Sequence, residues 1–409
     1  MGPEAADIKG QVGLLGNMPD MMRIKDSAMK SRIQFVISNL GTGGAEMMLY
    51  KLLSRIDRNR FVPEITSLTD YVPLAEKFRT IEVPVRVLKM RRGVPDPRWV
   101  FRLSNVLGQH RPHLVQTWMY HADLIGGLAA KLSGRIPVIW NIRHSSLAPG
   151  SSKRTTRLTA KACARLSSCL PAKIICCAET AKRIHIDLGY DSSRMLVIPN
   201  GFDLGSFKPD PEAKKNLSRE LGIPPGSIII GLVARFHPEK NHETFIQAAA
   251  LLKAKAPNVR FVLCGDGITW ENKELTAWIE AAGLHDSFHL LGHRSDIPQL
   301  VASFDIATSS SLSEGFSNTI GEAMACAVPC VVTDVGDSAS IVGKTGKVVL
   351  PQNPEALSTA WLELIDLERD GRQELGRLAR QRILQHYSLD LIVKRYEELY
   401  SDIVNVECK

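Results

Sequence analysis

The sequence has no long apolar run and none of the short patterns that bind metal ions. Its 409 residues contain no stretch of 18 or more apolar residues, and the N-terminus lacks a basic-then-apolar signal pattern. There is also no C-x-x-C pair, no H-E-x-x-H pattern and no D-x-D carboxylate pair. We therefore expect a soluble cytoplasmic protein that needs no metal ion or other cofactor.

Cysteines are few and show no pairing pattern. Several lie inside apolar runs such as residues 174–177, so we interpret them as reduced core residues. The eight cysteines are at positions 163, 169, 176, 177, 264, 326, 330 and 408.

Acidic residues are scarce in the first half of the chain. Residues 1–222 contain 34 Lys and Arg against 19 Asp and Glu, whereas residues 223–409 contain 17 against 24. A basic half predicts a polyanionic partner, either nucleic acid, an anionic membrane surface or a phosphorylated acceptor, although ordinary solvated charge is the alternative. Two clusters favour a partner: Lys89, Arg91, Arg92, Arg98 and Arg102, and Lys153, Arg154, Arg157, Lys161 and Arg165.

Short β-rich runs alternate with amphipathic helical segments from residue 33 onward, which predicts parallel, doubly wound sheets. A stretch rich in turn residues interrupts this alternation at 199–226, and the alternation resumes at residue 228. The length exceeds what one hydrophobic core usually supports, so two Rossmann-like domains facing across a cleft are predicted.

The predicted domain boundaries follow from these breaks. Residues 1–30 show no period and are predicted to be a flexible extension. The remaining predicted parts are an N-terminal domain at 31–205, a linker at 206–226, a C-terminal domain at 227–385 and a final helix at 386–409.

A glycine loop, residues 41–46 with the sequence GTGGAE, directly follows the first predicted strand and opens a helix. Without side chains at Gly43 and Gly44, backbone N–H groups can approach a phosphate at the positive end of the helix. The spacing differs from the dinucleotide G-x-G-x-x-G pattern, and a plain tight turn is an equally good interpretation.

Two cations follow the first strand of the second predicted domain. Arg235 and Lys240 lie five residues apart in a strand-to-helix loop, and a diphosphate fits between such a pair. Fixed cations in a dry cleft would stabilise the charge that develops on a departing nucleoside diphosphate. A surface loop with two solvated charges is the competing interpretation.

The richest segment is 311–325, with the sequence SLSEGFSNTIGEAMA. Glu314 and Glu322 lie eight residues apart on either side of a glycine loop and the first helical turn. Backbone amides of the loop would point at phosphate or sugar oxygens, and Glu322 would accept both ribose hydroxyls. The alternative is that both glutamates are ordinary helix charges. The loop residues concerned are Gly315, Phe316, Ser317, Asn318 and Thr319.

Taken together these motifs resemble family 4 retaining glycosyltransferases. The resemblance covers residues 33 to about 400 and includes the E-x7-E segment, the following 326–336, the cation pair, the glycine loop and 198–203 with the sequence IPNGFD. It implies the GT-B fold, with the acceptor held by the N-terminal domain and a nucleotide sugar by the C-terminal domain. It also implies a final helix that crosses back onto the N-terminal domain.

The resemblance assigns roles to single residues. It implies that Arg235 and Lys240 hold the diphosphate, that Glu322 binds ribose and that Glu314 contacts hydroxyls of the donor sugar. Gly43 and Gly44 would approach the diphosphate from the opposite domain.

The sequence departs from the family pattern at Trp118, where many relatives have a histidine. We expect the turn after strand 113–117 to project into the cleft, with His121 taking the histidine's catalytic role and Trp118 and Tyr120 near the acceptor. A structural histidine at a helix start is the alternative. A second departure is 337–340, where relatives often have a carboxylate near the donor.

A further basic group, Arg143 and His144, follows another predicted strand and could meet an acceptor phosphate. An ordinary loop arginine paired to a neighbouring acid is an equally good interpretation.

These observations predict a metal-independent, retaining transfer of a hexose or N-acetylhexosamine from a nucleotide sugar, with UDP favoured by family frequency. The predicted acceptor is a lipid-linked sugar or surface polysaccharide, and the predicted location is the inner membrane face, with no nucleic acid partner. Three alternatives remain: a nucleotide-sugar epimerase or hydrolase, a non-catalytic nucleotide-sugar-binding protein, and an NAD-dependent dehydrogenase, which the missing dinucleotide pattern disfavours.

Overall fold

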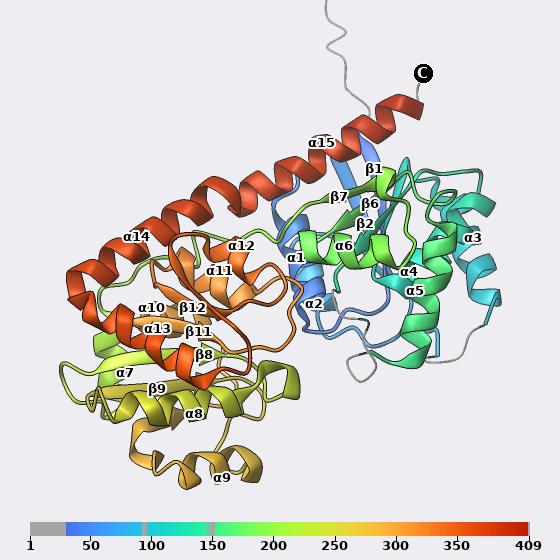
Figure 1. Cartoon of the computed structure of the whole chain (residues 1–409). Coiled ribbons are helices and arrows are strands. Elements are labelled where there is room, and N and C mark those ends of the chain that lie inside the picture. The colour runs from blue at the N-terminus through green and yellow to red at the C-terminus, as the bar shows by residue number, and fades with distance from the viewer. Residues whose placement is uncertain (1–29, 92–95, 145–146, 148–151, 408–409) are drawn as a thin grey trace, which may run out of the picture.

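The computed structural model describes residues 30–91, 96–144, 147 and 152–407. Within these residues the chain forms two lobes, each built on one all-parallel sheet with helices on both faces (Figure 1). Apart from Lys30, the predicted N-terminal extension lies outside the described residues. No helix in the described part of the chain has the length and apolar character needed to cross a bilayer.

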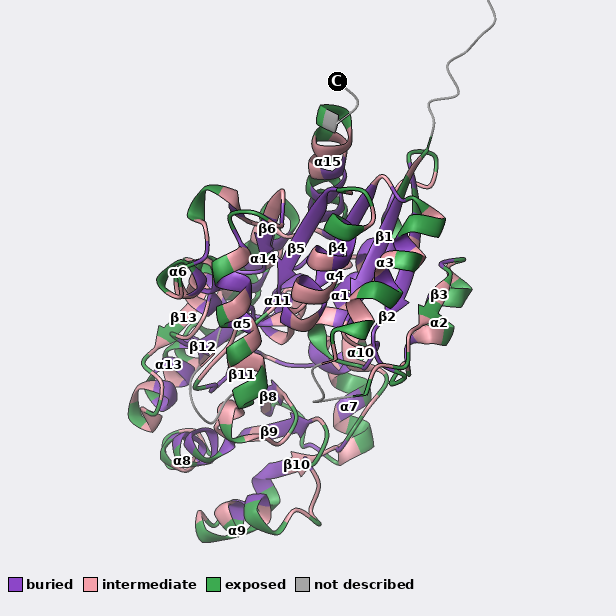
Figure 2. Cartoon of the chain, turned by 90° about the vertical axis from the view of Figure 1, so that its right-hand side faces the viewer, coloured by how far each residue is buried: buried purple, intermediate pink, exposed green. Residues whose placement is uncertain are grey.

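The N-terminal lobe contains a seven-stranded sheet with the order β3-β2-β1-β4-β5-β6-β7 among the described residues. Its strands read as apolar runs because helices cover both faces, and β4 and β5 are buried along their whole length (Figure 2). The strands are β1 Ser31–Ile37, β2 Phe61–Ser67, β3 Val85–Val87, β4 Leu114–Trp118, β5 Val138–Ile142, β6 Lys173–Cys176 and β7 Met195–Val197. The helices are α1 Gly44–Arg55, α2 Ala75–Thr80, α3 Arg98–His110, α4 Tyr120–Leu132, α5 Arg154–Leu166 and α6 Glu179–Asp187.

The C-terminal lobe contains a six-stranded sheet with the order β10-β9-β8-β11-β12-β13 among the described residues. Its strands are β8 Ile228–Val233, β9 Val259–Cys264, β10 Phe288–Leu290, β11 Ile306–Ser309, β12 Cys330–Thr333 and β13 Gly346–Val349. Its helices are α7 Ala213–Leu221, α8 His242–Lys253, α9 Lys273–Ala281, α10 Ile297–Ala302, α11 Asn318–Ala325, α12 Ser338–Val342, α13 Pro354–Asp366 and α14 Glu368–His386.

The chain passes between the lobes twice, and the two crossings lie side by side. Phe202 forms a parallel bridge with Ser388, and the Phe202 N–H donates to the Tyr387 carbonyl at 2.9 Å. The last helix, α15 Leu389–Glu407, then returns across the N-terminal lobe (Figure 1). Its buried Tyr396 and Tyr400 belong to the same hydrophobic core as β1 and α1.

Two sequence expectations differ from the fold. The stretch interpreted as a turn-rich linker contains helix α7, whose Leu217 is buried. Six of the cysteines are buried and unpaired as expected, but Cys169 is exposed, and Cys408 lies outside the described residues.

Candidate active site

A cavity of about 680 Å³ opens between the lobes at the carboxyl ends of strands from both sheets. The N-terminal lobe lines it with the loop after β1 and with Arg143 after β5, and the C-terminal lobe with the loops after β8, β9 and β11. In each sheet the strand order reverses beside the first strand, at β1/β4 and β8/β11. Parallel sheets bind ligands outside such points of reversal, so the cavity lies where the fold places a binding site.

Twelve of the predicted site residues line this cavity. They come from four different loops and both lobes, so the fold brings together residues up to 276 positions apart. They are Gly43, Gly44, Arg143, His144, Arg235, Lys240, Glu314, Gly315, Phe316, Ser317, Asn318 and Thr319.

Helix α1 points its N-terminus at the cavity without a side-chain cap. Gly43 occupies the N-cap position and forms no side-chain hydrogen bond to the first turn. A Cβ atom at Gly43 would lie 2.6 Å from Oε2 of Glu46, so a larger residue there would displace that carboxyl group. The helix dipole favours an anion at the N-terminus of α1, where the Glu46 carboxyl group already accepts a backbone hydrogen bond.

Helix α11 presents a second uncapped N-terminus from the opposite lobe. Its N-cap residue, Ser317, makes no side-chain capping bond, and the helix begins at Asn318. The two helix starts are close, because a Cβ atom on Gly44 would lie 3.0 Å from Nδ2 of Asn318. Two positive helix ends thus meet at one cavity, which favours a ligand with more than one negative charge.

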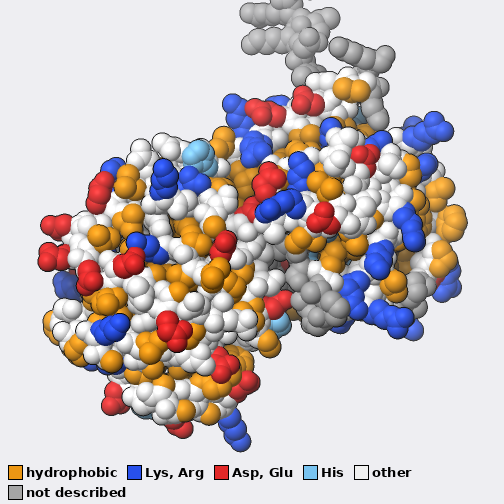
Figure 3. Space-filling view, in the orientation of Figure 1, with side chains coloured by type: hydrophobic (Ala, Val, Ile, Leu, Met, Phe, Trp, Pro, Cys, Tyr) orange, Lys and Arg blue, Asp and Glu red, His pale blue; other side chains and the backbone are white. Residues whose placement is uncertain are grey.

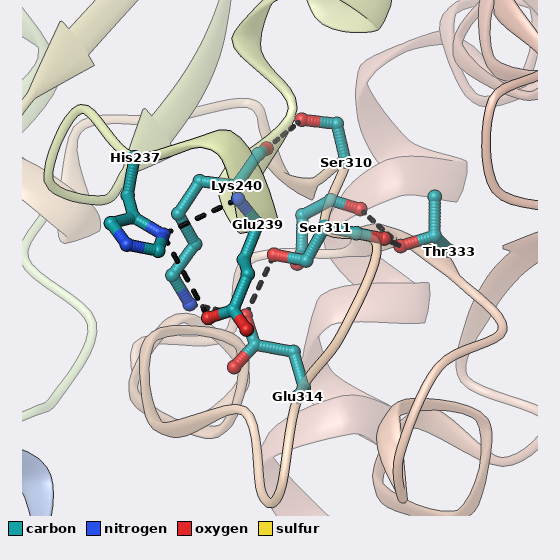
Figure 4. Close-up of polar contacts among 8 residues, drawn as sticks. His237, Glu239, Lys240, Ser310, Ser311, Glu314 and Thr333 are labelled. Atoms are coloured by element: carbon teal, nitrogen blue, oxygen red, sulfur yellow. Dashed lines mark hydrogen bonds and ion pairs between the residues drawn. The ribbon is translucent and has the colours of Figure 1, made fainter. Parts of the chain in front are cut away.

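The loop after β8 is fixed against the loop after β11, as Figure 4 shows. Ser310 Oγ donates to the Lys240 carbonyl at 2.9 Å, and the Leu312 N–H donates to the Glu239 carbonyl at 2.7 Å. Lys240 Nζ forms an ion pair with Glu314, whose Oε1 also accepts from Ser311 Oγ at 2.7 Å. The predicted phosphate cation and the predicted sugar-binding carboxylate are therefore partners of each other.

Arg235 lines the same cavity, but its charge is not shared with a carboxylate of the described residues as the charge of Lys240 is. Its side chain is exposed, and it forms no ion pair with any residue that the structure describes. Its charge is thus available to a ligand, whereas the charge of Lys240 is shared with Glu314.

Glu322 lies outside the main cavity and lines a smaller adjoining one of about 280 Å³, together with Gly44 and Asn318. Its Oε1 accepts from Nζ of Lys51 on α1 at 3.4 Å, an ion pair between the lobes. Burial raises the pKa of Glu322, and the nearby Lys51 opposes that shift. The position suits a carboxylate that receives hydroxyl hydrogen bonds beside the main cavity.

The acceptor-side residues divide into two groups. Arg143 and His144 line the cavity, and His144 Nε2 lies 3.2 Å from Ser152 Oγ. Trp118 is fully buried in the core beneath α15, with the Arg143 guanidinium 5.0 Å from its ring centroid. The expectation that Trp118 projects into the cleft is therefore wrong for the side chain, which points into the lobe.

Tyr120 is also directed into the lobe. It is 4% exposed, its hydroxyl lies 2.8 Å from Nε2 of His185, and the two rings stack at 5.6 Å. Burial raises the pKa of Tyr120 well above its ordinary value and lowers that of His185 to about 4. Tyr120 contributes to the core of the lobe and lies outside the lining of both cavities.

His121, the predicted catalytic histidine, lies outside the lining of both cavities as well. It is half-buried on the first turn of α4, and burial lowers its pKa. The preceding Met119 has φ 74° and ψ 153°, a backbone region that side chains rarely occupy, and this sharp turn aims Tyr120 into the core. The catalytic role of His121 stays a prediction.

Sequence reasoning missed four residues at this site: Lys51, Asn200, Arg294 and Asp337. Arg294 follows β10 and lines the cavity, so the strand-end rule could have found it. Asn200 lies in the quoted 198–203 motif but received no role. Lys51 meets Glu322 from 271 positions away, for which the sequence carries no signal.

Asp337 lies where the sequence departs from its relatives, and it joins the lobes. Its Oδ2 accepts the Glu179 N–H at 2.7 Å and its Oδ1 the Thr180 N–H at 3.0 Å, so it caps helix α6 of the other lobe. Beside it, a Cβ atom on Gly336 would lie 2.3 Å from the Glu314 carbonyl oxygen. The contact between lobes is therefore packed directly against the loop that carries Glu314.

The described residues contain no group of three or more His, Cys, Asp or Glu side chains arranged to hold a metal ion. Two helix N-termini open on the cavity. Its charged lining side chains are the basic Arg143, Arg235, Lys240 and Arg294 and the acidic Glu239, Asp266 and Glu314.

Comparison with known families finds two matches that divide the chain as the lobes do. The model for "Glycosyltransferase Family 4" matches residues 42–206, and the model for "Glycosyl transferases group 1" matches residues 227–366. Both matches include cavity-lining loops.

Two bacterial enzymes are similar over most of their length. The UDP-Gal:alpha-D-GlcNAc-diphosphoundecaprenol alpha-1,3-galactosyltransferase of Escherichia coli is 25% identical over 86% of this chain and 90% of its own. The N,N'-diacetylbacillosaminyl-diphospho-undecaprenol alpha-1,3-N-acetylgalactosaminyltransferase of Campylobacter jejuni is 27% identical over 80% of this chain and 88% of its own.

Solved structures share the fold. HepE of Anabaena, crystallised with UDP, superposes with a TM-score of 0.79 at 23% identity, covering 91% of this chain and all of that one. A glycosyltransferase from Rickettsia africae gives 0.81 at 20% identity, covering 92% of this chain and 99% of that one. The predicted GT-B fold is confirmed.

Proposed function

This chain belongs to the family 4 glycosyltransferases, and from that premise we propose that it moves a hexose or N-acetylhexosamine from UDP to a lipid-linked saccharide, with retention and without a metal ion. The observation that carries the proposal is the cavity where two uncapped helix N-termini and the exposed Arg235 converge from both lobes. Such a site stabilises a diphosphate by fixed dipoles and cations.

The proposed reaction is a substitution on one face of the sugar. The bond between the anomeric carbon and the diphosphate oxygen breaks, and the acceptor oxygen attacks from the same side. The leaving phosphate oxygen takes the proton of the incoming hydroxyl, so the enzyme's contribution is positioning and charge stabilisation. In this scheme Arg235 and Lys240 neutralise the diphosphate, Glu322 binds ribose and Glu314 orients the sugar.

Three features support the binding of a donor rather than of a simple phosphate. Glu322 lies in a side cavity that shares Gly44 and Asn318 with the main one, as a ribose next to a diphosphate requires. The main cavity, of about 680 Å³, is also lined by Arg294 and Ile297 and has room for more than a phosphate. Closure of the lobes would exclude water from the sugar, with movement expected where the crossings pair at Phe202 and Ser388.

The acceptor proposal rests on the named relatives and on the charge of the N-terminal lobe. Both curated relatives act on sugars linked through diphosphate to undecaprenol. Helices α3 and α5 flank α4 and carry basic side chains beside exposed apolar ones, with Phe101 61% and Leu158 57% exposed. Figure 3 shows Lys and Arg side chains along this side of the molecule. Such a surface would hold the enzyme on anionic lipid, where the acceptor lies.

The test is a panel of nucleotide sugars incubated with the purified protein and short-chain polyprenyl diphosphate saccharides, in buffer with and without EDTA. We expect UDP release only when donor and acceptor are both present, with unchanged rates in EDTA. NMR of the product should show the anomeric configuration of the donor.

Other outcomes separate the alternatives. UDP release without acceptor would identify a hydrolase, and binding without turnover across the panel would identify a nucleotide-sugar-binding protein. An inverted product would refute the same-face mechanism, and loss of activity in EDTA would refute metal independence.

A further inference from the structure

We propose that Arg143, on the N-terminal lobe, binds the sugar-bearing phosphate of the donor. Asn200 and Asn318 hold the Arg143 side chain in position relative to the loop after β11, which we call the donor loop. This assignment rests on the proposed function. It differs from the sequence expectation, in which Arg143 meets a phosphate of the acceptor.

The Arg143 guanidinium is held from two sides. It follows β5, lines the main cavity and lies with its central carbon 5.0 Å from the centroid of the buried Trp118 ring. One terminal nitrogen, Nη2, donates to Oδ1 of Asn200. Stacking and the hydrogen bond together fix the plane of the guanidinium, which suits recognition of a phosphate.

The other terminal nitrogen lacks a partner. Nη1 is buried and makes no hydrogen bond to any residue that the structure describes. A buried donor on a charged group is costly to leave unpaired, and such groups call for a partner that completes them. Glu46 of α1 is a buried acid near enough to interact electrostatically with Arg143, but no ion pair joins the two residues in the described part of the chain. Arg143 lines the cavity, so its guanidinium is placed to meet an anionic oxygen there.

Asn200 connects Arg143 to the donor loop. Its Oδ1 accepts from Arg143, and its Nδ2 donates to Oδ1 of Asn318 at 2.6 Å. Asn318 is the first residue of α11, whose N-terminus opens on the cavity. One amide side chain therefore sets the position of a cation from one lobe relative to the helix start of the other.

This linkage favours the donor over the acceptor as the source of the phosphate. A nucleoside diphosphate carries at least two negative charges, and in the C-terminal lobe Lys240 is already paired with Glu314. Arg235 is the remaining cation of the predicted pair without an ion-pair partner among the described residues. Arg143 supplies a second cation, from the opposite lobe.

The test compares UDP with UMP by calorimetry, because the two ligands differ only in the second phosphate. Arg143→Gln should weaken UDP binding about tenfold to a hundredfold and leave UMP binding unchanged, as expected for one charge-assisted contact. Arg143→Lys keeps the charge, loses the planar fork and should give an intermediate loss. Arg219→Gln, an exposed arginine on α7, is the charge-matched control and should bind both ligands as the wild type does.

Asn200→Ala tests the positioning role. It should lower UDP affinity less than Arg143→Gln, and the double variant should be no worse than Arg143→Gln alone, because both changes disable the same contact. Circular dichroism of each variant checks folding, and the lysine variant keeps the test valid if Arg143→Gln fails to fold.

Three results would overturn the assignment. Unchanged UDP affinity in Arg143→Gln with a raised KM for the acceptor would place the contact on the acceptor. Equal losses for UDP and UMP would show a structural role, and additive losses in the double variant would separate Asn200 from Arg143. Failure of the wild-type protein to bind UDP would instead refute the proposed function.

Discussion

The two lobes have the same kind of sheet but use its carboxyl edge differently. In the C-terminal lobe the strand-end loops present charged side chains to the cavity, with Arg235 and Lys240 after β8 and Glu314 after β11. In the N-terminal lobe the end of β4 and the turn after it place Trp118 and Tyr120 in the core. That lobe lines the cavity with the glycine loop after β1 and with a few side chains, among them Arg143 and Asn200.

This difference matches a division of chemical work. A lobe that binds a charged nucleotide needs fixed cations and helix dipoles at one place. A lobe that receives a second substrate needs room and few directed groups. With Arg143 proposed to bind the donor phosphate, His144 is the predicted acceptor-side residue that still lines the cavity. The same architecture therefore serves two roles through the residues at its strand ends, as expected when function lies in sites grafted on a fold.

The largest predicted effect lies in the charged edge of the C-terminal lobe. Arg235→Gln and Lys240→Gln should each lower kcat about 100-fold to 1,000-fold, because each removes a fixed charge from the leaving group. The measurement is steady-state UDP release with donor and acceptor at saturation. Arg219→Gln on α7 serves as control and should keep wild-type turnover.

Wild-type turnover in both variants would contradict the proposal that Arg235 and Lys240 stabilise the charge of the leaving group. Lys240→Gln should also raise the KM for the donor, since it leaves Glu314 without its ion-pair partner close to the proposed sugar site.

The second prediction compares one buried histidine in each lobe. Burial lowers the pKa of His185 and of His242 to about 4, from an ordinary value of 6.5. Between those pH values the unfolded chain binds more protons than the folded one, so stability is complete above pH 6.5 and falls as the pH drops to 4. The free energy of unfolding should fall by up to about 3 kcal/mol for each histidine, measured by urea denaturation across that range.

The two histidines differ in their partners, which provides the control. His185 pairs with the Tyr120 hydroxyl and the Ala181 carbonyl, whereas neither ring nitrogen of His242 has a partner among the described residues. His242→Leu should cost less than about 1 kcal/mol at pH 8 and remove its share of the acid sensitivity. His185→Leu should cost about 2–4 kcal/mol, because it leaves the buried Tyr120 hydroxyl unpaired. Equal costs would show that burial alone governs both sites.

Much of this architecture could be predicted from the sequence, because alternating strands and helices and glycine-containing strand ends are local signals. The predicted alternation begins at residue 33 and resumes at residue 228, close to the observed starts of β1 at Ser31 and of β8 at Ile228. Helix α7 was missed because proline and glycine breaks on both sides outweighed its short amphipathic pattern.

The errors at the site have a common physical cause. The direction of the Trp118 side chain depends on which face of β4 meets α15, and the turn that follows depends on the positive φ of Met119. Neither is encoded in the local pattern. Contacts such as Lys51 with Glu322 and Arg143 with Asn200 arise only when the lobes meet.

A smaller effect is expected at the contact that joins the lobes. Asp337→Ala removes both acceptors from the N-terminus of α6, so exchange of the Glu179 and Thr180 amides should accelerate about tenfold. Hydrogen exchange of the peptide that spans these amides measures the change, and kcat/KM should fall by a similar factor if closure positions Glu314.

The control is a cap within one lobe. Asp191 accepts the Ser193 N–H at 3.0 Å inside the N-terminal lobe, so Asp191→Ala should accelerate local exchange without lowering kcat/KM. Unchanged kcat/KM in Asp337→Ala would mean that the contact contributes stability alone.

The smallest predicted effect concerns a backbone position at the C-terminal end of helix α11. Ala327 has φ 60° at the end of α11, where the Val328 N–H donates to Ala323 and the Ala327 N–H to Met324, both at 3.0 Å. Helices that end this way usually have glycine at that position, because a side chain is strained there. Ala327→Gly should raise the free energy of unfolding by about 0.5 kcal/mol, because the relief of strain exceeds the entropy that glycine gains in the unfolded chain.

Gly222 ends α7 in the same conformation, with φ 66°, and Gly222→Ala should lower the free energy of unfolding by a similar amount. In the N-terminal lobe Arg111, with φ 43°, ends α3, and Arg111→Gly should likewise be stabilising. A loss of stability in Ala327→Gly would show that the alanine methyl group contributes more through packing than it costs in strain.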